Sequence, residues 1–165
     1  MKKSLQFLII LAITMFSLNV MGQTKISAIQ AKLFYNEKKD KQTNSDVSGN
    51  FSENIIDNSE ITLWNTIIGE GSAEGYSDQT IVIVEVTSIG QSNKDQILKL
   101  SASAGKKILL QQQRTFSCIG ENTKYKLLFL LNDTGCDKIT LKAEILKNGK
   151  NVSTMNKTIN FECGE

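Results

Sequence analysis

Short runs rich in β-branched and aromatic residues, separated by turn-forming residues, are the feature that most constrains the fold of this chain. The run Thr80–Val86 reads TIVIVEV, and a series this nearly continuous in β-branched residues is typical of a strand covered on both faces. Asn148-Gly149 separates the runs Lys138–Lys147 and Val152–Cys163, and Asn-Gly in that position indicates a two-residue hairpin. From residue 23 onward the pattern predicts an all-β domain.

The other expected strands have similar composition, and one of them has an alternative reading. Lys25–Tyr35 alternates apolar and polar residues, but its Ile26, Ile29 and Leu33 also fit one face of a helix. Ala104-Gly105 is expected to form the turn of a hairpin between the two runs that flank it. The remaining runs are Phe51–Asn58, a short edge strand, Glu60–Ile68, Ile97–Ala102, Lys107–Gln113 and Lys124–Leu131.

About eight strands at spacings of about 8–15 residues fit two packed antiparallel sheets. An immunoglobulin-like sandwich is therefore the first expectation for the fold. All three cysteines follow Trp64, the only tryptophan, so the Cys-Trp-Cys order of antibody domains is absent. A C2-like or jelly-roll sandwich remains the alternative.

Residues 1–22 have the three-part layout of a secretory signal peptide. Lys2 and Lys3 precede an apolar run from Phe7 to Phe16, and the segment closes with Val20-Met21-Gly22. We expect cleavage after Gly22, export to the periplasm or the cell exterior, and no integral membrane span in the mature chain. The alternative is an uncleaved N-terminal anchor.

Cleavage also changes the charge balance, which bears on the choice of partner. Removing 22 of 165 residues leaves 143, a length that fits one domain at 23–165. The leader carries two of the 19 basic residues and none of the 17 acidic ones, so the mature chain has 17 of each. A formally neutral domain has no basic excess to release counterions from nucleic acid, so the expected partner is a protein or a glycan.

The sequence offers no convincing catalytic or cofactor-binding motif. The absence of histidine removes the most common general base. Ser103-Ala104-Gly105-Lys106 has the Ser-x-x-Lys spacing of some acyl-transfer enzymes, but its companion motifs are missing and a turn is expected there. Neither set of clustered acids, Glu70 with Glu74 and Asp78 or Asp133 with Asp137, has a calcium-loop spacing. The prediction is therefore a non-enzymatic protein without cofactor or metal.

The glycine-rich segment Gly69–Gln79 is the sequence candidate for a partner-binding loop. It lacks the terminal Lys-Ser/Thr of a phosphate-binding loop, and its two glutamates would repel phosphate. Long loops on a rigid scaffold commonly carry binding surfaces, although a plain inter-strand loop is the simpler interpretation. The candidate contact residues are Glu70, Ser72, Glu74, Tyr76 and Asp78.

Two of the three cysteines are expected to form a disulfide in an oxidising compartment. If the chain folds back at Asn148-Gly149, residues whose numbers sum to about 297 lie opposite one another. Cys136 and Cys163 sum to 299, so they fall within two residues of this register, and one bulge or a slightly longer turn would bring them face to face. Cys118 would then be a buried small apolar residue, or a thiol able to link to another chain.

Several sequence blocks resemble a group of small exported Bacteroidetes proteins of unassigned function. The leader ending at Gly22 looks like the signal peptides of that phylum. The blocks are FSENIIDN (residues 51–58), LWNTIIGEGSAEG (63–75), NDTGC (132–136) and NFECGE (160–165). The resemblance implies a β-rich secreted or periplasmic domain and carries no catalytic residues.

Taken together, these features predict an exported interaction domain that binds through the Gly69–Gln79 loop or through an exposed strand edge. An inhibitor or immunity-type role belongs to the same class. The alternatives from other classes are a carboxylate-dependent glycoside hydrolase and a calcium- or sugar-binding module.

Thiol counting tests the expected disulfide. Under denaturing, non-reducing conditions one reactive thiol per chain is expected, because Cys136 and Cys163 are bridged and only Cys118 remains to react. Three reactive thiols per chain would contradict the pairing.

Overall fold

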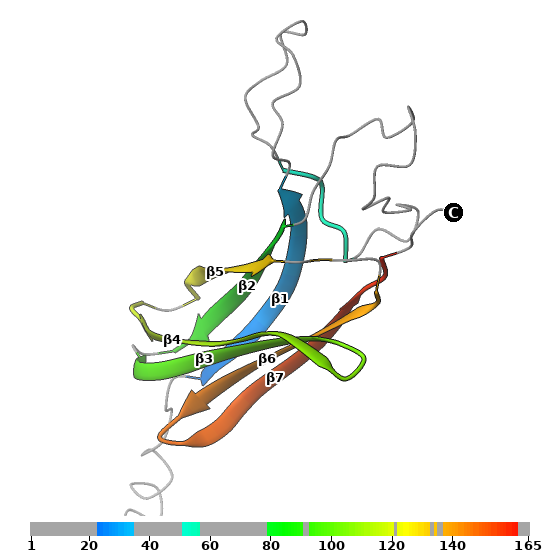
Figure 1. The fold of residues 1–165 in the computed structure, drawn as a ribbon. Helices are drawn as coiled ribbons and strands as arrows, with labels where there is room; N and C mark the ends of the chain where they lie inside the picture. Colours follow the sequence, from blue (N-terminus) through cyan, green and yellow to red (C-terminus); the bar gives the residue numbers. More distant parts are fainter. Residues whose placement is uncertain are drawn as a thin grey trace, which may run out of the picture.

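The computed structural model describes residues 23–34, 51–56, 79–90, 93–120, 122–132, 134 and 137–161. Seven strands account for most of them (Figure 1). Their bounds are β1 Gln23–Phe34, β2 Gln79–Ile89, β3 Asn93–Ala104, β4 Lys107–Cys118, β5 Lys124–Asn132, β6 Ile139–Lys147 and β7 Lys150–Ile159.

The strands form two antiparallel sheets that pack face to face (Figure 1). One sheet has three strands in the order β1-β2-β5, and the other has four in the order β4-β3-β6-β7. The predicted all-β, two-sheet antiparallel sandwich is confirmed.

The strand order is immunoglobulin-like with one strand moved to the other sheet. In the constant-type immunoglobulin sandwich, the first, second, fourth and fifth strands share one sheet. Here β4 pairs with β3 instead, in the sheet that also holds β6 and β7. The three-stranded sheet therefore ends at β5.

A two-residue turn explains why β4 joins this sheet. Ala104 lies opposite Lys107, so only two residues connect β3 to β4. Gly105 takes the first of these positions with a φ of 55°, a left-handed conformation that glycine adopts at little cost. A connection this short keeps β4 beside β3. The expected hairpin is confirmed, with its turn at Gly105-Lys106, one residue later than the expected Ala104-Gly105.

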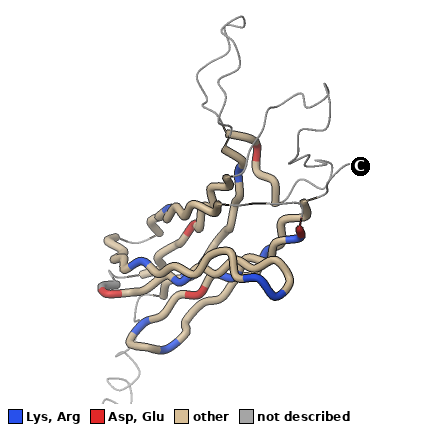
Figure 2. Tube along the Cα trace, viewed as in Figure 1, with Lys and Arg blue, Asp and Glu red and all other residues tan. Residues whose placement is uncertain are grey.

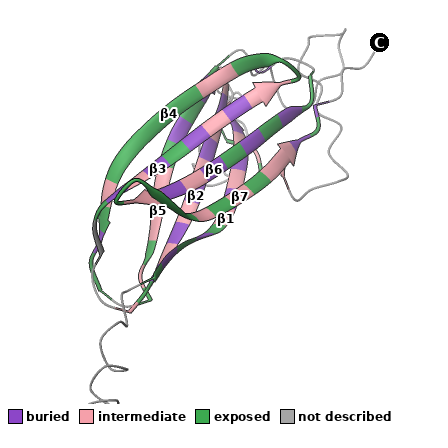
Figure 3. Cartoon of the chain, turned by 90° about the horizontal axis from the view of Figure 1, so that it is seen from below, coloured by how far each residue is buried: buried purple, intermediate pink, exposed green. Residues whose placement is uncertain are grey.

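The core lies between the sheets and is built from alternate residues of the strands (Figure 3). Phe129 is the largest of the fully buried side chains. Most inward-facing residues of β2, β3 and β6 are apolar, and they recur at every second position, as the period of a strand requires. The exceptions are Thr80, Ser88 and Gln96. The apolar residues include Val82, Val84, Val86, Leu98, Leu100, Leu141, Ala143 and Ile145.

A small polar cluster lies among these buried side chains. Gln96 is fully buried and donates a hydrogen bond of 2.9 Å from Nε2 to Thr24 Oγ1. Thr24 also interacts with the Cys118 thiol, whose pKa is raised by burial. The expectation that Cys118 is a buried residue is confirmed.

The β6–β7 hairpin follows the expected turn and adds a bulge. Asn148 and Gly149 have φ values of 51° and 74°, as a type I′ turn requires. The register shifts between Ile145 and Leu146, so that farther from the turn Ile139 lies opposite Ile159. This shift moves the register one residue toward the pairing of Cys136 with Cys163. Both cysteines lie outside the described residues, and the disulfide remains a prediction.

Three other expectations have different outcomes. The helical reading of Lys25–Tyr35 is wrong, because β1 runs from Gln23 to Phe34. Phe51–Asn58 is not a regular strand over its described part, where Phe51 forms an isolated bridge with Phe34. Thr80–Val86 is not buried on both faces, since alternate residues of β2 are only half-buried. The signal segment, the expected strand Glu60–Ile68 and most of the Gly69–Gln79 loop lie outside the described residues.

Two leucines on β5 provide a matched test of the two sides of this sheet. Leu131 is fully buried and Leu128 is 54% exposed. We expect Leu131→Ala to lower the free energy of unfolding by about 2–5 kcal/mol through the cavity it leaves. Leu128→Ala should change it by about 0.5 kcal/mol or less. Urea unfolding measures both, and equal losses would contradict this assignment of faces.

Candidate protein-interaction surface

The edge of the three-stranded sheet at β1 is covered by other parts of the chain. The backbone N–H groups of Ala31 and Leu33 donate to Asn54 Oδ1 at 3.0 Å and Ser52 Oγ at 2.9 Å. The backbone N–H of Ile26 donates to Ser153 Oγ on β7 at 3.0 Å. The β1–β2 register also shifts between Ile26 and Ala28. Side chains and a bulge therefore occupy the positions where another strand would pair.

The two edges of the four-stranded sheet are polar or irregular. The ladder between β4 and β3 shifts register near both ends. The middle of β4 presents Gln111, Gln112, Gln113 and Arg114, all exposed (Figure 3). On β7, Val152 is the one exposed large hydrophobic residue among the described positions. Charged, polar and bulged edges discourage pairing with another strand.

The edge at β5 is not bulged, and its two charged residues, Lys124 and Lys126, are confined to its first half. β5 pairs with β2 over all nine residues without a register shift, and among the described strands β2 is its only neighbour in the sheet. Leu128 and Leu130 are 54% and 43% exposed on its outer side. A regular edge strand presents every second residue's backbone N–H and C=O away from its sheet. β5 is therefore the described edge best suited to accept another strand.

The outer face of the three-stranded sheet beside β5 is partly apolar. Ile83 lies opposite Leu128 and Ile81 opposite Leu130, and all four side chains are at least partly exposed. Across the sheet, the rings of Phe34 and Phe51 are 5.3 Å apart between centroids. A hollow of about 360 Å³ lies on this face and is lined by Gln30, Lys32, Phe51, Ser52, Glu53, Ile81, Ile83, Lys126 and Leu128.

A second, wider opening lies between β5 and β4, where the two sheets meet at their free edges. It measures about 620 Å³ and is lined by Arg114, Thr115, Lys126, Leu127 and Leu128. The Arg114 guanidinium lies 5.2 Å from the centroid of the Phe129 ring, a cation–π contact that covers the core at this edge. One added strand beside β5 would enter this opening.

A tyrosine holds the β4–β5 connection in place at one end of the opening. The Tyr125 hydroxyl donates to the Ile119 carbonyl oxygen at 2.6 Å and accepts a hydrogen bond from the Ile119 backbone N–H. The Ser88 backbone N–H donates to the Thr123 carbonyl oxygen at 3.0 Å. The connection is thereby tied to both β2 and β5, which fixes where the edge begins.

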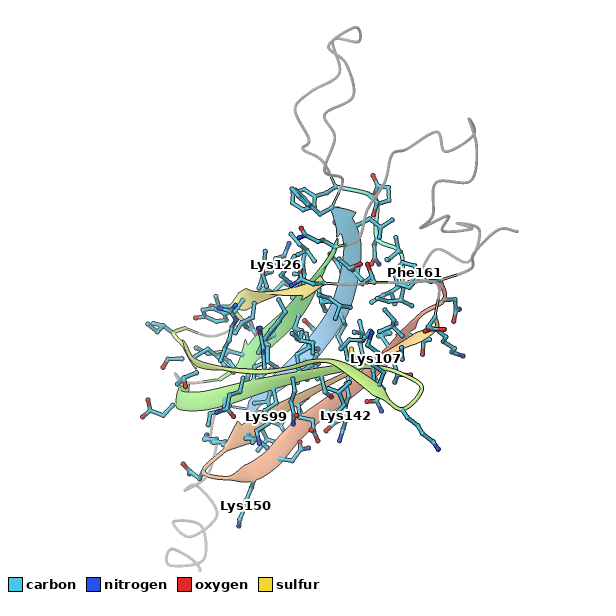
Figure 4. All side chains as sticks on the ribbon, in the orientation of Figure 1. Lys99, Lys107, Lys126, Lys142, Lys150 and Phe161 are labelled. Atoms are coloured by element: carbon cyan, nitrogen blue, oxygen red, sulfur yellow. The ribbon has the colours of Figure 1, made fainter. Side chains whose placement is uncertain are left out.

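Two lysines, Lys124 and Lys126, lie at the same end of β5. Figure 2 marks lysines and arginines along the chain in blue, and Figure 4 labels Lys126. Lys124 Nζ lies 3.2 Å from Glu85 Oε1, and Ser27 Oγ donates to the same carboxylate oxygen at 2.9 Å. Lys126 lies directly opposite Glu85 in the ladder, but its ammonium forms no ion pair within the part of the chain that the structure describes. Glu85 therefore neutralises the charge of Lys124 more fully than the charge of Lys126.

The sequence and the structure point to different surfaces. Of the loop Gly69–Gln79 only Gln79 is described, as the first residue of β2; Glu70, Ser72, Glu74, Tyr76 and Asp78 lie outside the described residues. The structure instead brings together Leu128, Leu130 and Lys126. A signal for them was present in the run KYKLLFLL, where these two leucines and the two lysines occupy every second position. Alternate residues of a strand share one face, and lysines favour the exposed face. The exposure of the two leucines could therefore have been inferred.

Comparison with known proteins gives no family assignment. No protein-family model matches this chain, and no curated protein matches it. Within the described ranges, no group of three or more acidic, histidine or cysteine side chains could hold a metal ion. A search of the same ranges for helices with the length and hydropathy to cross a bilayer finds none.

The environment of Glu85 makes a pH-dependent contribution to stability. The hydrogen bond from Ser27 and the contact with Lys124 lower the pKa of Glu85 below its ordinary value of 4.5. A carboxyl group with a lowered folded-state pKa stabilises the fold above its unfolded-state pKa and loses that effect as the pH falls through the folded-state value. Glu85→Gln should therefore destabilise the protein at pH 7, with a difference that shrinks below about pH 4.5.

Urea unfolding of both proteins between pH 7 and pH 3 measures this difference. Ser27→Ala removes the largest cause of the shift, so it should make the stability less dependent on pH in the same range. A difference between wild type and Glu85→Gln that stays constant down to pH 3 would contradict the assignment.

Proposed function

We propose that this chain is a non-enzymatic interaction domain, exported to the periplasm or the cell exterior, that binds an extended segment of a partner protein by strand addition at β5. The observation that carries the proposal is the regular β5 edge with exposed Leu128 and Leu130, beside three edges that are covered, polar or bulged. Main-chain hydrogen bonds would provide affinity, and side-chain contacts on alternate residues would provide specificity.

The surroundings of the edge support the same proposal. A strand added beside β5 would lie next to the opening between β4 and β5, and its outward side chains would extend the apolar surface of Ile81 and Ile83. An exposed apolar patch with a polar rim is typical of an interaction site. Export rests on the leader-like residues 1–22.

A peptide-display library tests the proposal directly. Random peptides of nine residues, the length of β5, are selected on the mature protein, and binding is mapped by hydrogen exchange of backbone amides. We expect the selected peptides to slow exchange in residues 124–132 and to leave β4 and β7 unchanged, because they pair with the free edge of β5.

Two equally exposed hydrophobic residues supply a matched control. Leu130 on β5 and Val152 on β7 are each 43% exposed. Leu130→Asp should weaken peptide binding at least tenfold, and Val152→Asp should leave it unchanged, with circular dichroism confirming that both variants fold. Protection elsewhere than in β5, or equal effects of the two variants, would overturn the proposal.

A further inference from the structure

The outer side of β5 is divided into a basic half and an apolar half. Lys124, Lys126, Leu128 and Leu130 occupy alternate positions and therefore share one side of the strand. The two lysines come first in the chain and the two leucines follow. Any strand that pairs along this edge meets a direction-dependent pattern of charge and apolar surface.

The basic half has positive charge that the described residues do not neutralise. Lys124 is paired with Glu85, whereas the described lining of the opening between β4 and β5 includes Lys126 and Arg114 and no acidic side chain. Arg114 contacts the face of Phe129, which leaves the guanidinium without a carboxylate among the described ion pairs. An incoming acidic side chain would complement both cations.

We infer that the partner strand runs antiparallel to β5 and reads apolar-x-apolar-x-acidic, with its apolar residues opposite Leu130 and Leu128 and its acidic residue opposite Lys126. This inference rests on the proposed function. The direction follows from the sheets themselves, since every ladder is antiparallel and parallel pairing is slightly less stable per residue. Opposite charges and apolar pairs placed directly across two strands stabilise the pairing.

The same charges disfavour a second copy of this chain as the occupant. If two β5 strands paired antiparallel over their full length, Lys126 of each copy would lie opposite the apolar Leu130 of the other and not opposite an acidic residue. Lysines on edge strands are a common means of preventing self-association. An acidic partner segment is therefore a better match than β5 itself.

Three heptapeptides with blocked ends test the pattern. The first is Ser-Val-Thr-Val-Thr-Glu-Thr, the second is its reversed sequence, and the third replaces Glu with Lys. Binding to the mature protein is measured by NMR shift titration, with hydrogen exchange locating the site. We expect the first peptide to protect β5 and the other two to bind at least about fivefold more weakly.

Charge reversal on the protein completes the test. Lys126→Glu should weaken the first peptide about fivefold and strengthen the lysine peptide by a similar factor. Lys99→Glu is the matched control, since Lys99 is an exposed β3 residue on the other sheet (Figure 4), and it should change neither affinity.

The outcomes separate the inference from the proposed function. If both peptide directions protect β5 equally, or if Lys126→Glu changes no affinity, the inference is overturned while strand addition stands. If sedimentation shows a dimer that Leu130→Asp dissociates, the occupant is a second copy and the inference is also overturned. If neither these peptides nor library peptides protect β5, both are wrong.

Discussion

The two-residue turn between β3 and β4 is the constraint on which the interaction surface depends. Gly105 adopts a left-handed conformation and brings Lys107 opposite Ala104, so β4 forms its ladder with β3. β4 therefore belongs to the four-stranded sheet, and among the described residues it forms no ladder with β5. Among the described residues, β4 is an edge of the four-stranded sheet and β5 an edge of the three-stranded sheet, and both border the same opening.

The incomplete sheet is stabilised without closing its edge. Phe129 fills the core at β5, and the Arg114 guanidinium covers its ring from β4. Tyr125 fixes the connection between the two strands through both hydrogen bonds to Ile119. These contacts are made by side chains, whereas the outward backbone groups of β5 have no strand partner among the described residues. The domain can therefore remain folded while the outer edge of β5 stays available for pairing with another strand.

Charge gives this edge a direction. Glu85 lies opposite Lys126 in the ladder but contacts Lys124 most closely, and Ser27 holds its carboxylate in place. The remaining positive charge and the exposed leucines then lie in successive parts of one strand. A partner segment must match both parts in the correct order, which provides selectivity that main-chain hydrogen bonds alone cannot supply.

The sequence by itself determined the all-β class, the two-sheet arrangement and both hairpins, because alternation and the turn residues Gly105, Asn148 and Gly149 act locally. It also indicated that Cys118 is buried. Only the tertiary structure decided that β2 has a half-exposed outer face rather than two buried ones. Burial of a strand face depends on what packs against it from distant parts of the chain, which residue periodicity does not encode. For the same reason, the sequence located an apolar run at Lys124–Leu131, while the structure showed it to be an edge strand among the described residues.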